Sequence, residues 1–87
     1  MNREAVINLM KEVFPEKEIT GEALDKFTKS LKELSPKEEA VITLRYGLDD
    51  GEEACVEEVA DTYEVTREKI LEVIDGVFKK LRHPARQ

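Results

Sequence analysis

Few residues of this sequence have the types and spacing of a reactive or metal-binding site. The single cysteine, Cys55, lies in a run of glutamates, whereas a reactive or metal-binding thiol needs basic neighbours or further ligands. The single histidine, His83, has no Cys or Ser partner nearby in the sequence that would suggest catalysis. If Gly51 were the glycine of a calcium loop, Tyr46 and Leu48 would occupy its first two ligand positions, so we exclude calcium. We therefore expect no enzyme activity, no metal site, no cofactor and no small-molecule substrate.

The composition predicts one small domain without a disulfide or a membrane anchor. The chain has 87 residues, of which 40% are hydrophobic, and no apolar stretch approaches the ~20 residues that a membrane-spanning helix requires. A lone cysteine excludes an internal disulfide and fits a reducing compartment. No apolar run of signal-peptide length follows the N-terminus. We therefore expect a cytoplasmic protein.

The charge is unevenly distributed along the chain. The net charge of -6 works against nucleic-acid binding, because phosphates repel an anionic protein. Residues 1–64 carry eight Lys or Arg against 17 Asp or Glu, whereas residues 65–87 carry six against three. The sequence thus indicates an acidic body with a modestly basic C-terminal helix.

Apolar residues recur at helical spacing along the whole chain and predict an all-α fold. Residues 1–30 are expected to form an N-terminal helical extension, which packs on a core made by residues 31–87 in one compact domain. The predicted helices cover residues 3–14, 21–34, 36–46, 56–62 and 67–82.

Several of these helix boundaries have clear end signals. Ser35, with Pro36 and Glu38 behind it, has the pattern of a capping box with proline at the first helical position. Gly47 can adopt the left-handed conformation that ends a helix. Thr66 is a suitable N-cap for the last helix.

The last two predicted helices have the apolar pattern of a helix-turn-helix. That motif needs a small residue where the helices cross, and Ala60 suits this position. Glu64 stands at the turn position that is often glycine, which is a mild departure. The inward positions would then be Val56, Val59, Tyr63, Val65, Ile70 and Val73. Ordinary helix pairs also show apolar spacing, so the pattern alone leaves both a helix-turn-helix and an unrelated helix pair open.

Short segments between Leu31 and Arg86 form a series that is specific to one family. In chain order they are Leu34-Ser35-Pro36-Lys37-Glu38, Val41, Leu44-Arg45-Tyr46-Gly47-Leu48, Asp50-Gly51, Glu57-Glu58-Val59-Ala60, Val65-Thr66-Arg67-Glu68 and Lys80-Leu81-Arg82-His83-Pro84. In this order and spacing they closely resemble domain 4 of the housekeeping-type sigma factors of the sigma-70 family. The resemblance covers well over half of the chain and implies a helix-turn-helix within a small helical bundle.

The resemblance implies contacts with the −35 element of promoters, where sigma domain 4 places its last helix in the major groove. Arg67 and Glu68 match the family residues that read bases after the capping threonine, which is Thr66 here. Arginine can donate two hydrogen bonds to guanine, and glutamate can accept one from cytosine. Lys69 and Arg45 match basic positions that contact the DNA backbone. Further positions expected at the DNA are Glu72, Lys79 and Lys80.

Departures from the family weaken these expected contacts. Leu71 and Glu72 stand where the family usually has arginine and glutamine, and Ile74 and Gly76 replace a usual glutamate and lysine. Each lost phosphate partner removes about one unit of the salt slope of DNA binding. An apolar strip of Leu71, Ile74 and Phe78 appears instead. Four alternatives are open for this strip: the N-terminal helices cover it, it stays partly exposed, it binds a protein partner, or it mediates self-association.

Two functions fit this sequence. The first is a small transcription regulator that binds −35-like promoter DNA through residues 66–72 and contacts RNA polymerase, because domain 4 in the family also binds the flap of the polymerase β subunit. The second is a protein–protein interaction module with little DNA binding, a sigma mimic or adaptor for RNA polymerase, an anti-sigma factor or an activator. With 87 residues the chain is too short to hold the other sigma domains, so we do not expect a complete sigma factor.

Overall fold

The computed structural model describes residues 2–82, and within that range the protein is helical and contains no strand. His83 and the residues after it lie outside the described part. The helices are α1 (Arg3–Val13), α2 (Gly21–Lys32), α3 (Pro36–Tyr46), α4 (Val56–Tyr63) and α5 (Arg67–Arg82). Each end lies within two residues of its predicted place, so the all-α prediction is confirmed. None of the helices in this range has the length and apolar character needed to cross a membrane.

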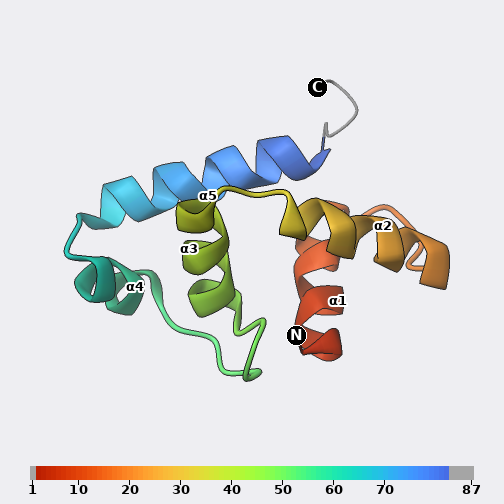
Figure 1. The fold of residues 1–87 in the computed structure, drawn as a ribbon, viewed down its shortest axis with the longest axis horizontal. Coiled ribbons are helices and arrows are strands. Elements are labelled where there is room, and N and C mark those ends of the chain that lie inside the picture. Colours follow the sequence, from red (N-terminus) through yellow and green to blue (C-terminus); the bar gives the residue numbers. More distant parts are fainter. Residues whose placement is uncertain (1, 83–87) are drawn as a thin grey trace.

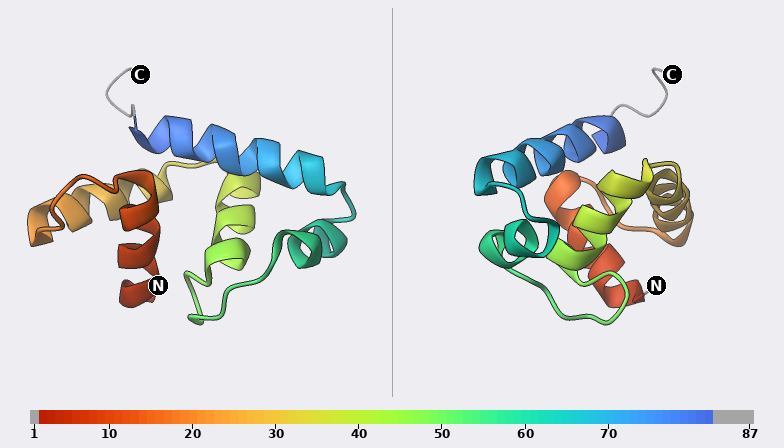
Figure 2. Two further views of the ribbon diagram at one scale, coloured as in Figure 1. Left: turned by 180° about the vertical axis from the view of Figure 1, so that it is seen from behind. Right: turned by 60° about the vertical axis from the view of Figure 1, so that its left-hand side comes forward.

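The other helices are arranged around α5. Figure 1 shows α5 running along the top of the molecule, with α3 and α1 crosswise to it. At one end α4 packs beneath the N-terminal half of α5, and α2 lies towards the other end (Figures 1 and 2). The long last helix therefore contacts every other helix of the described part.

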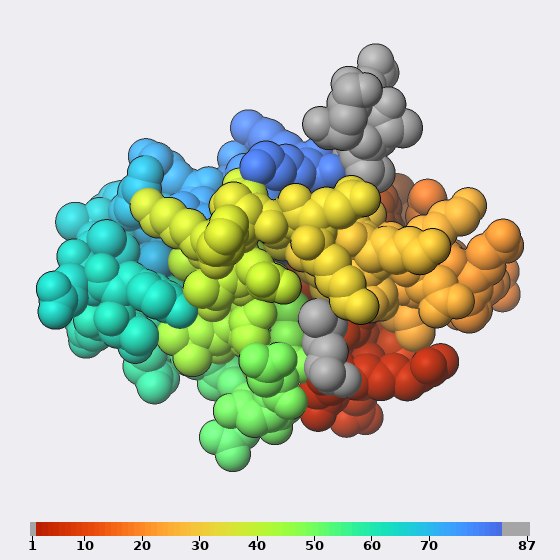
Figure 3. All heavy atoms as spheres, viewed as in Figure 1, coloured from red at the N-terminus to blue at the C-terminus, as the bar shows by residue number. Residues whose placement is uncertain are grey.

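Two clusters of buried apolar side chains hold the helices together. The larger cluster joins α1 and α2 to the C-terminal half of α5, and it includes Leu9 and Val77. The smaller cluster lies between α3, α4 and the N-terminal half of α5, and it includes Val59 and Ile70. In the space-filling view, α2 and the start of α3 form a continuous band across the front of the molecule (Figure 3). The two halves of α5 thus rest on different cores.

Helix α3 is buried on two sides and connects the two clusters. Val41 belongs to the smaller cluster, whereas its neighbour Ile42 belongs to the larger one. Adjacent residues of a helix point in directions about 100° apart, so a helix that buries both cannot have a single narrow apolar stripe. Like α5, α3 therefore contributes side chains to both clusters.

The predicted helix ends are present. The hydroxyl of Ser35 accepts a hydrogen bond from the Glu38 N–H at 3.2 Å, and the Glu38 carboxylate accepts one from the Ser35 N–H at 3.1 Å. This reciprocal pair is the predicted capping box. Gly47 ends α3 in the left-handed conformation, with a φ of 64°. The Thr66 hydroxyl caps α5 by accepting a hydrogen bond from the Lys69 N–H at 3.1 Å.

Both ends of α1 are bonded to distant parts of the chain. Asn2 caps the helix by accepting a hydrogen bond from the Ala5 N–H at 2.9 Å, and its own N–H donates to the Leu48 carbonyl. At the other end, Nε of Arg82 donates to the Val13 carbonyl at 3.0 Å. These bonds fix α1 against the segment that follows α3 and against the last turn of α5.

A substitution at Glu64 tests the turn between α4 and α5. Glu64 has a φ of 57°, and the left-handed conformation costs a non-glycine residue about 1–2 kcal/mol. We expect Glu64→Gly to raise the free energy of unfolding by about 0.5–1 kcal/mol, because glycine also adds freedom to the unfolded chain. Urea unfolding followed by circular dichroism measures this change.

The matched control for that turn is Glu72→Gly, which places glycine at an exposed position inside α5. It should lower the free energy of unfolding by about 1 kcal/mol. If both substitutions destabilise the protein equally, the backbone conformation assigned to Glu64 is wrong.

Candidate nucleic-acid interface

Helices α4 and α5 pack as a helix-turn-helix around a small buried residue. Ala60 is buried at the expected crossing point, and Val59 and Ile70 beside it are almost fully buried. The N–H of Val65 donates to the Ala60 carbonyl at 3.0 Å and closes the turn. The helix-turn-helix predicted from the apolar spacing is therefore present.

Tyr63 departs from the predicted pattern, because its side chain is 41% exposed rather than turned inward. The buried cluster between α4 and α5 also contains Val41 of α3, which a pattern drawn from two helices does not include. Tyr63 instead lines a groove of about 310 Å³ between α3 and α5. Lys37 and Lys69 also line this groove. The sequence did not indicate that Lys37 lies beside the last helix, because nothing in its spacing links it to that helix.

The first turn of α5 presents the predicted base-reading residues to solvent. Arg67 is the first helical residue, and Glu68 and Lys69 follow it; all three are exposed. Glu72 is exposed one turn further along the helix. Because the Ile70 side chain points into the core, Glu68, Lys69 and Glu72 must face away from it. Arg67 lies nearer to the Ile70 face and is exposed as the first residue of the helix. The packing of the helix-turn-helix thus sets the direction of the residues that we expect at DNA.

Most of the cations predicted to face DNA are already paired with carboxylates of the same chain. Every ion pair between described residues uses one of them. The pairs are Arg45–Glu53 at 3.8 Å, Arg67–Glu57 at 3.4 Å, Lys79–Asp75 at 3.1 Å and Lys80–Glu38 at 2.8 Å. Within residues 2–82, Lys69 is the one predicted cation that has no such pair. Phosphates would have to compete with these carboxylates, which lowers the affinity gained from each cation.

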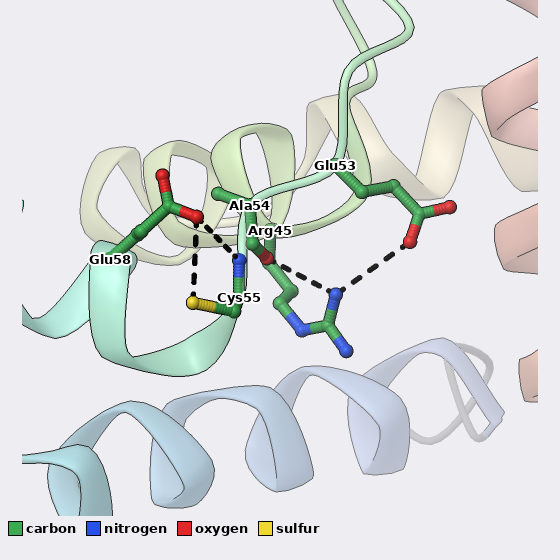
Figure 4. Close-up of polar contacts among 5 residues, drawn as sticks. All are labelled: Arg45, Glu53, Ala54, Cys55 and Glu58. Carbon is green, nitrogen blue, oxygen red and sulfur yellow. Dashed lines mark hydrogen bonds and ion pairs between the residues drawn. The ribbon is translucent and has the colours of Figure 1, made fainter.

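Arg45 fastens the segment between α3 and α4, a role that the sequence did not indicate. Its Nη1 donates to the Ala54 carbonyl at 3.2 Å and lies 3.8 Å from the Glu53 carboxylate (Figure 4). The guanidinium also lies over the Tyr46 ring, 5.0 Å from its centroid. A contact with the DNA backbone would therefore have to use its remaining N–H groups.

Cys55 lies beside this segment and has the geometry of a helix cap. The Glu58 carboxylate accepts hydrogen bonds from the Cys55 N–H and from its thiol, both at 3.4 Å (Figure 4). That Cys55 is unreactive stays a prediction.

The Lys80–Glu38 pair joins the last helix to the start of α3. The hydrogen bond from Lys80 holds the pKa of the Glu38 carboxyl below its usual value, although partial burial acts in the opposite direction. Because the pKa is lowered in the folded state, the pair stabilises the fold at pH values above the ordinary pKa of glutamate. That contribution is lost as the pH falls through the lowered pKa of Glu38.

The apolar strip of Leu71, Ile74 and Phe78 is largely part of the core. Ile74 and Phe78 are partly buried and pack against the larger cluster, and the Phe78 ring lies 6.3 Å from that of Tyr46. Only Leu71, with 49% of its surface exposed, extends into solvent. Ile74 and Phe78 are thus covered within the protein, by a cluster that includes residues of α1 and α2 and Tyr46 of α3.

Comparisons with known proteins agree with this geometry. A family model described as sigma-70, region 4 matches residues 30–83. The chain is 45% identical to the RNA polymerase sigma factor SigA of Clostridium acetobutylicum over 62 residues, which are 71% of this chain and 16% of that protein. It is 42% identical to SigA of a Nostoc species over 73 residues, or 83% of this chain and 19% of that protein.

These matches define both the extent and the limits of the similarity. A match over 73 of the 87 residues necessarily includes α2, so the similarity begins before residue 31. The chain spans less than a fifth of the length of these relatives. With the family model covering most of the chain and the helix-turn-helix in place, this protein belongs to the sigma-70 region 4 family.

Proposed function

We propose that this protein is a sigma factor-like transcription regulator that binds −35-like promoter DNA through the first turns of α5. The observation that carries the proposal is the exposed series Thr66, Arg67, Glu68 and Lys69 at the start of the second helix of the helix-turn-helix. Arginine and glutamate at this place can read guanine and cytosine edges in the major groove. Glu72, Lys79 and Lys80 would lie further along the same helix.

A contact with RNA polymerase is a second part of the proposal. The relatives named above are RNA polymerase sigma factors. The resemblance to sigma domain 4 implies that the contact would be with the flap of the polymerase β subunit. We place the protein in the cytoplasm, where both partners are found, and assign it no catalytic role. Residues 1–30 would act as a packing extension of the DNA-binding part.

The direct test is fluorescence-anisotropy binding to a −35-like duplex and to a scrambled duplex of equal length. Binding is measured at low and at physiological salt, because affinities for DNA have meaning only at a stated salt concentration. A preference for the −35-like duplex, with affinity falling as salt rises, is the expected result.

The residue-level prediction concerns Arg67. We expect Arg67→Ala to abolish the preference for the −35-like duplex, because a bidentate contact to guanine contributes about 1–3 kcal/mol of discrimination. The matched control is Lys79→Ala, which should weaken binding to both duplexes equally and lower the salt slope by about one. If the preference survives in Arg67→Ala, α5 is not aligned on DNA as proposed.

A second function is favoured by the net charge of -6 and by the exposed Leu71 side chain. The protein would then be a protein-binding module that mimics a sigma factor towards RNA polymerase, an anti-sigma factor or an activator. Absence of binding to either duplex even at low salt would contradict the DNA-reading function and support this one.

A further inference from the structure

The ion pair between Glu57 and Arg67 connects the beginnings of the two helices of the helix-turn-helix. Glu57 lies in the first turn of α4, and Arg67 is the first residue of α5. Oε2 of Glu57 lies 3.4 Å from Nε of Arg67, and the two side chains are 58% and 61% exposed. The pKa of Glu57 is lowered by its own backbone N–H and by the charge of Arg67, so the carboxylate is ionised at neutral pH. The pair is thus accessible to DNA and fully charged.

The ion pair with Glu57 leaves the terminal Nη groups of Arg67 available to contact a base. The contact with Glu57 is made through Nε, and no hydrogen bond or ion pair from the terminal Nη atoms of Arg67 occurs within the described residues. Arginine can meet the O6 and N7 atoms of guanine with two N–H groups at its terminal edge. A carboxylate on the Nε side therefore holds the guanidinium without blocking that edge.

We propose that Glu57 is a positioning residue that determines how strictly Arg67 reads its base. Holding the guanidinium before binding reduces the side-chain entropy that must be lost in the complex. Glu57 itself would not touch a base. This role presupposes the DNA-reading function proposed above.

A positioning role has a signature that a purely structural role lacks. The Glu57 carboxylate repels nearby phosphates, so its removal should raise the affinity for any duplex. The same removal frees Arg67 and should lower the preference for the correct base pair. Affinity and sequence preference would therefore change in opposite directions.

The experiment compares Glu57→Gln with Glu58→Gln on two duplexes that differ only in the guanine pair read by Arg67. Glu58 is the matched control, because it lies in the same turn of α4 and bonds to Cys55 instead of to an arginine. We expect Glu57→Gln to bind both duplexes more tightly and to lose about threefold in preference, the range of an exposed ion pair. Glu58→Gln should also bind both duplexes more tightly, with an unchanged preference.

Two outcomes separate this inference from the function on which it rests. If the wild-type protein prefers the guanine duplex and Glu57→Gln keeps the full preference, Glu57 has no positioning role and the DNA-reading function stands. If the wild-type protein shows no preference at any salt, the DNA-reading function fails and the role of Glu57 fails with it.

NMR of the Arg67 Nε–H group tests the pair without DNA. We expect restricted motion of this group in the wild-type protein and in Glu58→Gln, and free motion in Glu57→Gln. Free motion in the wild-type protein would overturn the inference whatever the binding data show.

Discussion

Replacing Leu9 by alanine is expected to lower the free energy of unfolding by about 2–5 kcal/mol, the range found for leucine-to-alanine changes in packed cores. Leu9 lies in α1 and has 0% of its surface exposed. It belongs to the larger cluster, together with residues of α2 and α5. A small domain has only about 5–15 kcal/mol of stability in total, so this loss would be a large fraction of it.

Urea unfolding of Leu9→Ala should be compared with that of Leu71→Ala, which makes the same change on an exposed helical position. The exposed leucine loses little burial, and its replacement should cost less than about 1 kcal/mol. Leu9 precedes the residues that the family model matches. Equal effects of the two substitutions would mean that α1 does not pack on the sigma region 4 part as described.

The second large effect is expected from Gly47→Ala at the end of α3. Gly47 has a φ of 64°, which an alanine adopts at a cost of about 1–2 kcal/mol. A Cβ atom at this position would also lie only 2.6 Å from the backbone nitrogen of Glu52. Relieving that overlap requires a backbone shift, for which overpacking costs of about 1–3 kcal/mol are typical. We therefore expect a loss of about 2–4 kcal/mol, measured by thermal or urea unfolding.

Gly76→Ala is the control for Gly47→Ala, because it makes the same substitution where nothing lies within 4 Å of the added Cβ. Gly76 lies inside α5, where alanine is favoured over glycine by about 0.5–1 kcal/mol. The control should therefore stabilise the protein. A neutral Gly47→Ala variant would show that the turn after α3 has another backbone conformation.

Local features of the fold could be predicted because they depend on residues close together in the sequence. The capping box at Ser35 and the left-handed Gly47 each involve neighbours within one turn of helix. The exposure of Tyr63 could not be predicted in this way. The pattern of α4 and α5 does not include α3, whose Val41 packs in the same buried cluster while Tyr63 stays outside it.

In the candidate site too, features that depend on neighbouring residues could be predicted, and features that depend on tertiary packing could not. The exposure of Glu68 and Lys69 follows from helical periodicity once Ile70 is placed in the core, whereas that of Arg67 depends on its place at the start of the helix. The carboxylate partners of the predicted cations do not follow from it. The partner of Lys80, for example, lies 42 residues earlier in the chain, and only tertiary packing brings the two together. Sequence alone thus overstated the positive charge available to DNA.

The hydrogen bond from Arg82 to the Val13 carbonyl spans 69 positions of the chain, and it has a consequence for how the protein opens. Helix α1 cannot detach while the last turn of α5 keeps this bond and its apolar contacts. We therefore expect the first helix and the end of the last one to open together, as one cooperative unit in hydrogen exchange.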